Sequence, residues 1–229
     1  MSALESQALL LSLRVALAAM LLALPLAVAL AWALARGRFP GKPVLEAVVN
    51  LPLVLPPVVI GYALLVTFGR NGPLGRWLHD VFGLQFVFTF RGAVLAAAVM
   101  ALPLMVRSIR QGLEAVDLGL EAAARTLGAS RARVFATITL PLMAPGLLSG
   151  AVLGFAASLG EFGATITFVS NVPGQTQTLP LAIYSALQQP GGEEAAARLV
   201  GMAVLLALAA LGAAQWCHHR VQRWLGQVA

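Results

Sequence analysis

The stretch LEAAARTLGASRARVFATITLP, residues 120–141, decides the fold. Asp117, just before it, can cap a helix that begins at Leu118, because an aspartate side chain accepts a hydrogen bond from an early helical amide. Alanine and leucine then favour helix through Leu127. Gly128 can close that helix in a left-handed turn. These residues therefore predict a short helix that ends at a glycine corner.

A second short helix is predicted after the corner. Ser130 can cap it, and it leads into an uncharged run over residues 134–160, with Pro141 near the start of that run. The stretch before the first helix, residues 88–106, is also apolar. The two short helices therefore form a loop, residues 107–135, between two apolar segments.

The composition indicates that the apolar segments cross a membrane. Of the 229 residues, 59% are hydrophobic and 10% are charged, whereas soluble domains carry roughly 25% charged residues. A helix needs ~20 apolar residues to cross the hydrocarbon layer. We therefore predict one all-α integral membrane domain over residues 1–229 with about five transmembrane helices. The predicted spans cover residues 8–35, 44–68, 88–106, 136–160 and 199–217.

The first span is predicted to be retained rather than cleaved as a signal peptide. A signal peptide needs a basic amino-terminal region and a short apolar core, whereas residues 1–7 hold Glu5 and no Lys or Arg. Arg14 lies near enough to the end of the span to snorkel. In the second span, Pro56 and Pro57 remove backbone donors and kink the helix. This kink either borders a transport pathway or serves packing alone.

The distribution of Lys and Arg sets the orientation, because these residues collect on the cytoplasmic side. One side of the predicted topology carries ten of them and the other carries four. The ten are Arg36, Arg38, Lys42, Arg107, Arg110, Arg125, Arg131, Arg133, Arg220 and Arg223. The four are Arg70, Arg76, Arg91 and Arg198. The amino terminus is therefore predicted outside, and the carboxyl terminus and residues 107–135 in the cytoplasm.

The stretch over residues 162–192 is uncharged but too polar and too broken for a clean span. Residues 179–187 could form one short helix there. A re-entrant or outward-facing segment fits better than a sixth crossing, since a further crossing would place the arginines of the tail outside.

Candidate residues for a pathway or gate lie around the end of the fourth span. Small residues allow helices to approach closely, and threonine hydroxyls can donate hydrogen bonds. Glu161 is an ionisable residue at membrane depth, where such residues mark functional sites. The alternative is a Glu161 that lies at the outer interface, solvated or paired with an arginine. The candidates are Pro56, Pro57, Ser158, Glu161, Phe162, Thr165 and Thr167.

The loop resembles the EAA loop of ABC importer permeases. That family pattern is Glu-Ala-Ala, three residues, Gly, nine residues, Ile, one residue, Leu-Pro. Gly128, Ile138, Leu140 and Pro141 keep this spacing, while the glutamate position falls on Ala122. The resemblance implies that the loop inserts into a groove on a cytoplasmic ATPase. The implied docking residues are Glu121, Ala122, Ala123, Ala124, Arg125, Leu127, Gly128 and Ala129, with Ile138, Leu140 and Pro141 as the junction to the next span.

Four further segments resemble the permeases of bacterial molybdate importers. They are FPGK at 39–42, LPLVLPPVV at 51–59, RGAVLAAAVM at 91–100 and GEFGAT at 160–165. The resemblance implies a multi-pass protein of the bacterial inner (cytoplasmic) membrane with the type I ABC importer permease fold. It implies a homodimer that passes molybdate, or tungstate, by alternating access. The implied partners are membrane lipid, two ATPase subunits that use ATP and Mg, and a periplasmic or lipid-anchored protein that captures the oxyanion.

Several kinds of chemistry find no support in the sequence. It contains no Gly-x-x-x-x-Gly-Lys-Ser/Thr phosphate loop, so we expect no enzyme activity in this chain and ATP hydrolysis by a partner. His79, His218 and His219 have no metal-ligand spacing with the single cysteine, Cys217, so no bound metal or other cofactor is expected. The Lys and Arg residues that give the net charge of +6 lie beside the apolar spans, where they set the topology. No nucleic-acid partner is therefore expected.

Two alternative transport functions remain open at this stage. A sulfate or thiosulfate importer permease would share the loop. The loop does not distinguish these cargoes, because the capture protein selects the anion. An ion-gradient-driven transporter usually shows repeated halves and embedded charges, and the sequence shows no repeat. A membrane-embedded enzyme would need a catalytic constellation, and no paired carboxylates or Ser/His/Asp arrangement stands out.

Overall fold

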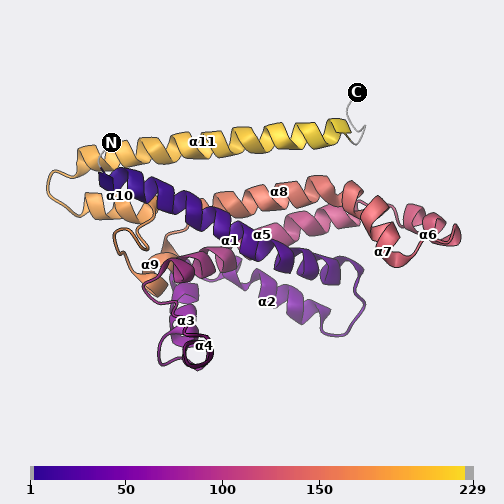
Figure 1. Ribbon diagram of the computed structural model, residues 1–229, viewed down its shortest axis with the longest axis horizontal. Helices are drawn as coiled ribbons and strands as arrows, with labels where there is room; N and C mark the ends of the chain where they lie inside the picture. The colour runs from indigo at the N-terminus through magenta and orange to yellow at the C-terminus, as the bar shows by residue number, and fades with distance from the viewer. Residues whose placement is uncertain (1–2, 225–229) are drawn as a thin grey trace.

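The computed structural model describes residues 3–224, and in that range it contains helices and no strands (Figure 1). The side chains of Cys217, His218, His219, Arg220 and Arg223 lie outside the described residues. The helices are α1 (Ala3–Arg36), α2 (Lys42–Val54), α3 (Pro57–Phe68), α4 (Pro73–Phe82), α5 (Phe90–Glu114), α6 (Leu118–Thr126), α7 (Arg131–Val134), the π-helical turn η1 (Phe135–Thr139), α8 (Leu140–Leu159), α9 (Gly163–Val169), α10 (Leu179–Leu187) and α11 (Glu193–Trp224).

Four helical segments of the described chain are long and apolar enough to cross a membrane. They are Leu4–Arg36, Phe90–Glu114, Arg131–Leu159 and Glu193–Ala213. The pair α2 and α3 adds a fifth crossing if it is counted as one broken span. The prediction of an all-α membrane protein is confirmed, with four candidate spans in the described chain, or five if the bent pair is counted.

The segment expected as one kinked helix over residues 44–68 is instead two helices. The helix axis bends by 114° between α2 and α3, which is much sharper than a proline kink within one helix. The residue before a proline is driven out of the α region, and here two prolines follow one another. Leu55 (ψ 144°) and Pro56 (ψ 136°) are therefore both extended, and the helix stops and restarts.

Helix α5 also departs from the sequence prediction, because it continues beyond residue 106 to Glu114. The first part of the predicted loop is therefore a helical extension of the span. Ser108, Ile109 and Leu113 in this extension are buried. The non-helical connection after α5 begins only at Ala115.

The core lies where α5 packs between α1 and α8, and small residues bring α5 and α8 close together. A Cβ added to Gly146 would lie 2.7 Å from the Cα of Gly112, and one added to Gly150 would lie 2.8 Å from Ile109 Cγ1. Ser108 Oγ donates a hydrogen bond to the carbonyl oxygen of Gly146 at 3.2 Å. Small residues at intervals of four allow this approach in membrane helices.

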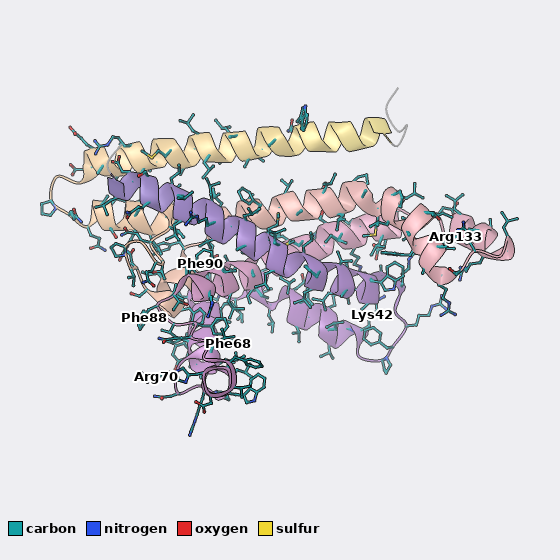
Figure 2. The ribbon with its side chains drawn as sticks, viewed as in Figure 1. Lys42, Phe68, Arg70, Phe88, Phe90 and Arg133 are labelled. Carbon is teal, nitrogen blue, oxygen red and sulfur yellow. The ribbon has the colours of Figure 1, made fainter. Side chains whose placement is uncertain are left out.

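The ends of the long helices lie at two opposite ends of the molecule, in the arrangement that the predicted topology requires. The end of α1, helices α6 and α7 and the end of α11 lie at one end of the molecule, while the starts of α1 and α11 lie at the other (Figure 1). Lys42 and Arg133 lie at the first end, and Arg70 lies away from it on the α3–α4 connection (Figure 2). At the other end, Arg198 Nε contacts Glu5 Oε1 at 3.0 Å and joins α11 to α1.

Residues 162–192 form the short helices α9 and α10 with a turn between them. Helix α10 spans Leu179–Leu187, the residues that the sequence analysis proposed for one short helix. Helix α9 has 7 residues and α10 has 9, and a crossing needs ~20. Neither helix is therefore a sixth span.

Candidate coupling loop and pathway

The loop between α5 and α8 has the local structure that its residues predict. Asp117 Oδ1 accepts a hydrogen bond from the amide of Gly119 at 2.7 Å and caps α6. Ser130 Oγ accepts from the amide of Arg133 at 3.3 Å and caps α7. Between them Gly128 has a φ of +86°, in the left-handed region that favours glycine. The two short helices and their glycine corner are thus fixed by capping and by one backbone angle.

Helix α6 turns most of its apolar side chains to the outside. None of its residues is buried. Leu118 and Leu120 are 57% and 50% exposed, and Leu127 at the corner is 89% exposed. Ala122 and Ala123 are exposed as well, while Ala124 and Ala129 are half-buried. A helix with small residues and exposed leucines offers an apolar surface that a partner protein can cover.

Glu121 is the side chain of α6 that points inward. Its side chain is only 12% exposed, and Oε1 lies 3.1 Å from Nη2 of Arg36, the last residue of α1. The same oxygen accepts a hydrogen bond from Thr139 Oγ1 at 2.8 Å. Ala122, which occupies the glutamate position of the family pattern, is exposed. Glu121 thus anchors the loop to its own chain.

Arg36 was predicted only as a topology residue, one of the ten basic residues on the side predicted to be cytoplasmic. In the sequence it is one of several basic residues that follow a span, and such residues ordinarily set topology alone. Its partner Glu121 lies 85 residues away. Only the packing of α1 beside the loop brings the two together.

A π-helical turn, η1, joins the loop to the span α8. The amide of Leu140 donates to the carbonyl of Phe135, five residues back. Pro141 follows in the first turn of α8, which continues η1 without a break because Thr139 and Leu140 both have helical dihedrals. Its missing amide therefore removes one backbone hydrogen bond to the preceding turn. Ile138 is half-buried and Leu140 is 38% exposed. π-Helical turns are rare and recur at functional sites, and this one lies at the predicted junction.

Beneath the loop lies an open pocket of about 390 Å³. Its lining includes Trp32 of α1 and Phe135 of η1, whose rings meet edge to face at 5.4 Å. Glu121, Arg125, Arg131, Ala132, Val134 and Thr139 complete the lining. The loop therefore rests on the end of α1 with space between them, rather than in a close-packed contact.

The pathway candidates of the second and fourth spans come together although they lie about a hundred residues apart. A Cβ on Gly163 would lie 2.7 Å from Pro57 Cβ. A Cβ on Gly61 would lie 2.6 Å from the carbonyl oxygen of Ala164 and 2.8 Å from Thr167 Cβ. Helix α3 therefore packs directly on α9, and glycine makes the contact possible on both sides.

Glu161 holds the start of α9. Its Oε1 accepts a hydrogen bond from the amide of Ala164 at 2.7 Å. No arginine contacts Glu161 among residues 3–224, so the ion pair considered for it is not formed there. Thr167 Oγ1 donates to the carbonyl of Gly163 at 2.8 Å. Glu161 thus ties the α8–α9 connection to the first turn of α9, whereas the Thr167 bond lies within α9.

The remaining candidates in this segment are placed differently from one another. Ser158 and Thr165 are 4% and 2% exposed, and Ser158 Oγ has no hydrogen-bond partner within the described residues. Phe162 is half-buried and its ring lies 5.3 Å from that of Tyr184 on α10. Pro56 is exposed. The predicted set therefore divides into packing residues and residues at a surface.

A second polar pocket, of about 350 Å³, lies between α2 and α5 and was not predicted. Arg110 reaches Glu46 Oε1 through Nη1 and Glu114 Oε1 through Nε, both at 2.7 Å. Arg107, Asn50 and Gln111 also line it. The spacing of Arg110 and Glu114, four residues apart on one helix, was the signal available in the sequence.

No group of three or more His, Cys, Asp or Glu that could hold a metal ion occurs in the part of the chain that the structure describes. The side chains discussed above are ion pairs, caps and apolar surfaces.

Comparison with known proteins identifies the family. The profile of the family "Binding-protein-dependent transport system inner membrane component" matches residues 13–223. The "Molybdenum transport system permease protein ModB" of Haemophilus influenzae is 59% identical over 224 residues, which cover 98% of this chain and 98% of that protein. The protein of the same name from Escherichia coli K12 is 60% identical over 212 residues, 93% of each chain.

A solved structure shows the same fold. A chain of a bacterial alginate ABC transporter, in complex with its alginate pentasaccharide-bound periplasmic protein, has a TM-score of 0.77 at 17% identity. The match covers 96% of this chain and 80% of that chain. The fold is therefore that of a type I ABC importer permease, as predicted. The chain is a multi-pass inner-membrane protein that belongs to the binding-protein-dependent transport system inner membrane component family.

Proposed function

We propose that this chain is the membrane-spanning subunit of an ATP-driven importer that passes molybdate into the cytoplasm, with tungstate as the other candidate cargo. The observation that carries the proposal is α6. It is capped at Asp117, ends at the left-handed Gly128, carries no buried residue, and is held to the membrane domain through Glu121. A partner protein can bind such a helix, and the helix can transmit the partner's movement to the membrane spans.

A cytoplasmic ATPase that uses ATP and Mg supplies the energy for transport. Leu118, Leu120 and Leu127 form the exposed apolar surface that its groove covers. The junction at η1 and Pro141 then carries the movement of α6 into α8. Because α8 packs tightly on α5 through glycines, the two spans move together.

The cargo assignment rests on different evidence. Two proteins at 59% and 60% identity carry the name of a molybdenum transport permease. A periplasmic or lipid-anchored capture protein delivers the oxyanion, and two copies of this chain enclose one pathway that opens alternately to each side. The α3–α9 contact lies in the region proposed as the gate, and Glu161 organises it rather than binding an anion.

The test is transport by the whole importer in proteoliposomes. The permease, its partner ATPase and its capture protein are reconstituted, and molybdate uptake is measured with ATP and Mg and with a non-hydrolysable ATP analogue. We expect uptake only with hydrolysable ATP, and little loss of molybdate uptake in excess sulfate. Uptake without ATP would favour an ion-gradient-driven transporter. Uptake of sulfate or thiosulfate in place of molybdate would refute the cargo assignment.

A further inference from the structure

The last residue of α1, Arg36, joins four elements of the cytoplasmic end. Its Nη2 donates to the carbonyl oxygen of Leu113 at the end of α5, at 3.3 Å. The same nitrogen lies 3.1 Å from Glu121 Oε1 on α6, and that oxygen also accepts the hydrogen bond from Thr139 in η1. Helices α1, α5 and α6 and the turn η1 thus meet at one guanidinium and one carboxylate.

This cluster is largely, but not fully, removed from water, since Glu121 and Thr139 also line the open pocket beneath the loop. The side chains of Arg36 and Glu121 are 18% and 12% exposed, and Thr139 is 1% exposed. Charge-assisted hydrogen bonds in such surroundings are stronger than those on a surface, and removal of one partner leaves a charge uncompensated. Loss of either partner would therefore disturb the contact between α6 and α1 more than loss of a partner in an exposed ion pair would.

The pairing in the cluster is incomplete, however. One nitrogen, Nη2, serves both acceptors, and Arg36 Nε is buried without a hydrogen-bond partner among the described residues. An arginine and a carboxylate commonly form two parallel hydrogen bonds. The Arg36 guanidinium therefore has an unused donor, Nε. A small shift of Glu121 would let the guanidinium exchange an acceptor or gain one.

A second contact joins α1 to the loop one turn earlier. The ring of Trp32 meets the ring of Phe135 in η1 edge to face at 5.4 Å. Next to both contacts lies the open pocket of about 390 Å³, so the loop has room to move against the end of α1. The end of α1 is therefore held at two points across a space that is not close-packed.

We propose that Arg36 is a positioning residue that transmits the movement of α6 to α1, so that ATP drives the first span as well as α8. The inference deepens the proposed function and depends on it. During the transport cycle α6 shifts, Glu121 changes its contact with the Arg36 guanidinium, and α1 follows because its end is held by that pair and by Trp32. Arg36 touches no cargo in this account.

The reading that Arg36 is only a structural clamp makes a different prediction. A clamp that merely keeps α6 in shape would, when removed, weaken docking of the ATPase. ATP hydrolysis that depends on docking and molybdate uptake would then fall in proportion. A transmitting residue, in contrast, would leave docking and hydrolysis in place and lose uptake.

The experiment measures both rates on the same proteoliposomes that hold the complete importer. The variants are Arg36→Gln, Glu121→Gln and the exchange Arg36→Glu with Glu121→Arg. Arg38→Gln is the matched control, because Arg38 is an exposed arginine two residues away. Molybdate taken up per ATP hydrolysed is expected to fall about tenfold in the single variants, which lies within the range for residues that couple two sites. The exchange should recover part of the ratio, and the control should keep it.

Two outcomes would overturn the inference. One is an unchanged ratio of uptake to hydrolysis in Arg36→Gln, whether both rates persist or fall together. The other is a ratio that falls equally in Arg38→Gln. Both outcomes presuppose that the unaltered importer takes up molybdate with ATP, so a failure of the proposed function is recognised separately in the unaltered protein. Recovery of the complex with its ATPase during purification checks that each variant folds and assembles.

Discussion

At the scale of single residues, Gly128 is a position where the effect of backbone conformation can be tested apart from the effect of steric crowding within the chain. Its φ is +86°, and nothing lies within 4 Å of the position that a Cβ would occupy. A side chain there would meet no clash within the described chain. Within the chain, the substitution acts through the cost of the left-handed backbone, which is about 1–2 kcal/mol for an ordinary L-residue.

We expect Gly128→Val to insert into the membrane at normal levels and to lose molybdate uptake, because the corner that sets the angle of α6 opens. Asparagine tolerates the left-handed region better than other residues, so Gly128→Asn should keep most of the uptake. Uptake in cells, normalised to membrane-inserted protein, checks both variants. Normal uptake by Gly128→Val would show that the corner does not couple.

Glu161 offers a second residue-scale test, because its carboxylate accepts a hydrogen bond from the amide of Ala164 at 2.7 Å. A glutamine retains a side-chain oxygen for that bond and an alanine does not. Loss of a capping bond costs about 1 kcal/mol, and α9 has only 7 residues to absorb it. We expect uptake to survive in Glu161→Gln and to fall in Glu161→Ala. Equal loss in both variants would assign the role to the negative charge instead.

At the scale of elements, the contact between α5 and α8 depends on glycines. A Cβ at Gly146 would lie 2.7 Å from the Cα of Gly112 and 3.0 Å from the carbonyl oxygen of Ser108. These are backbone atoms, which cannot rotate away. The two helices would therefore have to separate to accommodate any larger residue.

We expect Gly146→Val to lower the free energy of unfolding by about 1–3 kcal/mol, the usual cost of overpacking. Gly201→Val on α11 is the matched control, because nothing lies within 4 Å of its Cβ position. Thermal unfolding of the two purified variants in the same detergent gives the comparison. A melting temperature lowered as much by Gly201→Val as by Gly146→Val would contradict this account of the core.

How far the sequence predicts these elements depends on how local their causes are. Asp117, Gly128 and Ser130 act within four residues of themselves, and the structure forms the caps and the corner that they predict. The 114° break comes from two successive prolines, whose combined effect is stronger than the kink expected from each. The predicted end of α5 was wrong because burial of Ile109 and Leu113 extends the helix beyond the apolar span. The length of the apolar stretch in the sequence does not show this burial.

The contact between Arg36 and Glu121 could not be predicted from sequence patterns at all. It depends on the rotation of α1 about its axis and on the place where α6 folds back, and both are set by packing over the whole length of the spans. The glycines at 146, 150 and 154 were visible as small residues at intervals of four, a pattern that indicates close helix packing in membranes.

At the scale of the whole molecule, one copy of the chain leaves a large apolar surface on α2, α3 and α4. Val54, Tyr62 and Phe82 are 79%, 61% and 60% exposed. We expect the intact importer to contain two copies of this chain and two of the ATPase, as the proposed homodimer requires. Native mass spectrometry of the purified complex measures the stoichiometry. One permease copy per complex, or a second and different permease chain, would contradict the homodimer.

The central claim is that a partner ATPase drives transport through α6. It is tested most directly by a photoreactive amino acid placed at Leu127, which is 89% exposed at the corner, and separately at Phe82, which is 60% exposed on α4. Illumination of an importer that is active in molybdate uptake should cross-link position 127 to the ATPase and should leave position 82 without an ATPase cross-link. A cross-link from position 82, or none from position 127 in an active complex, would contradict the claim.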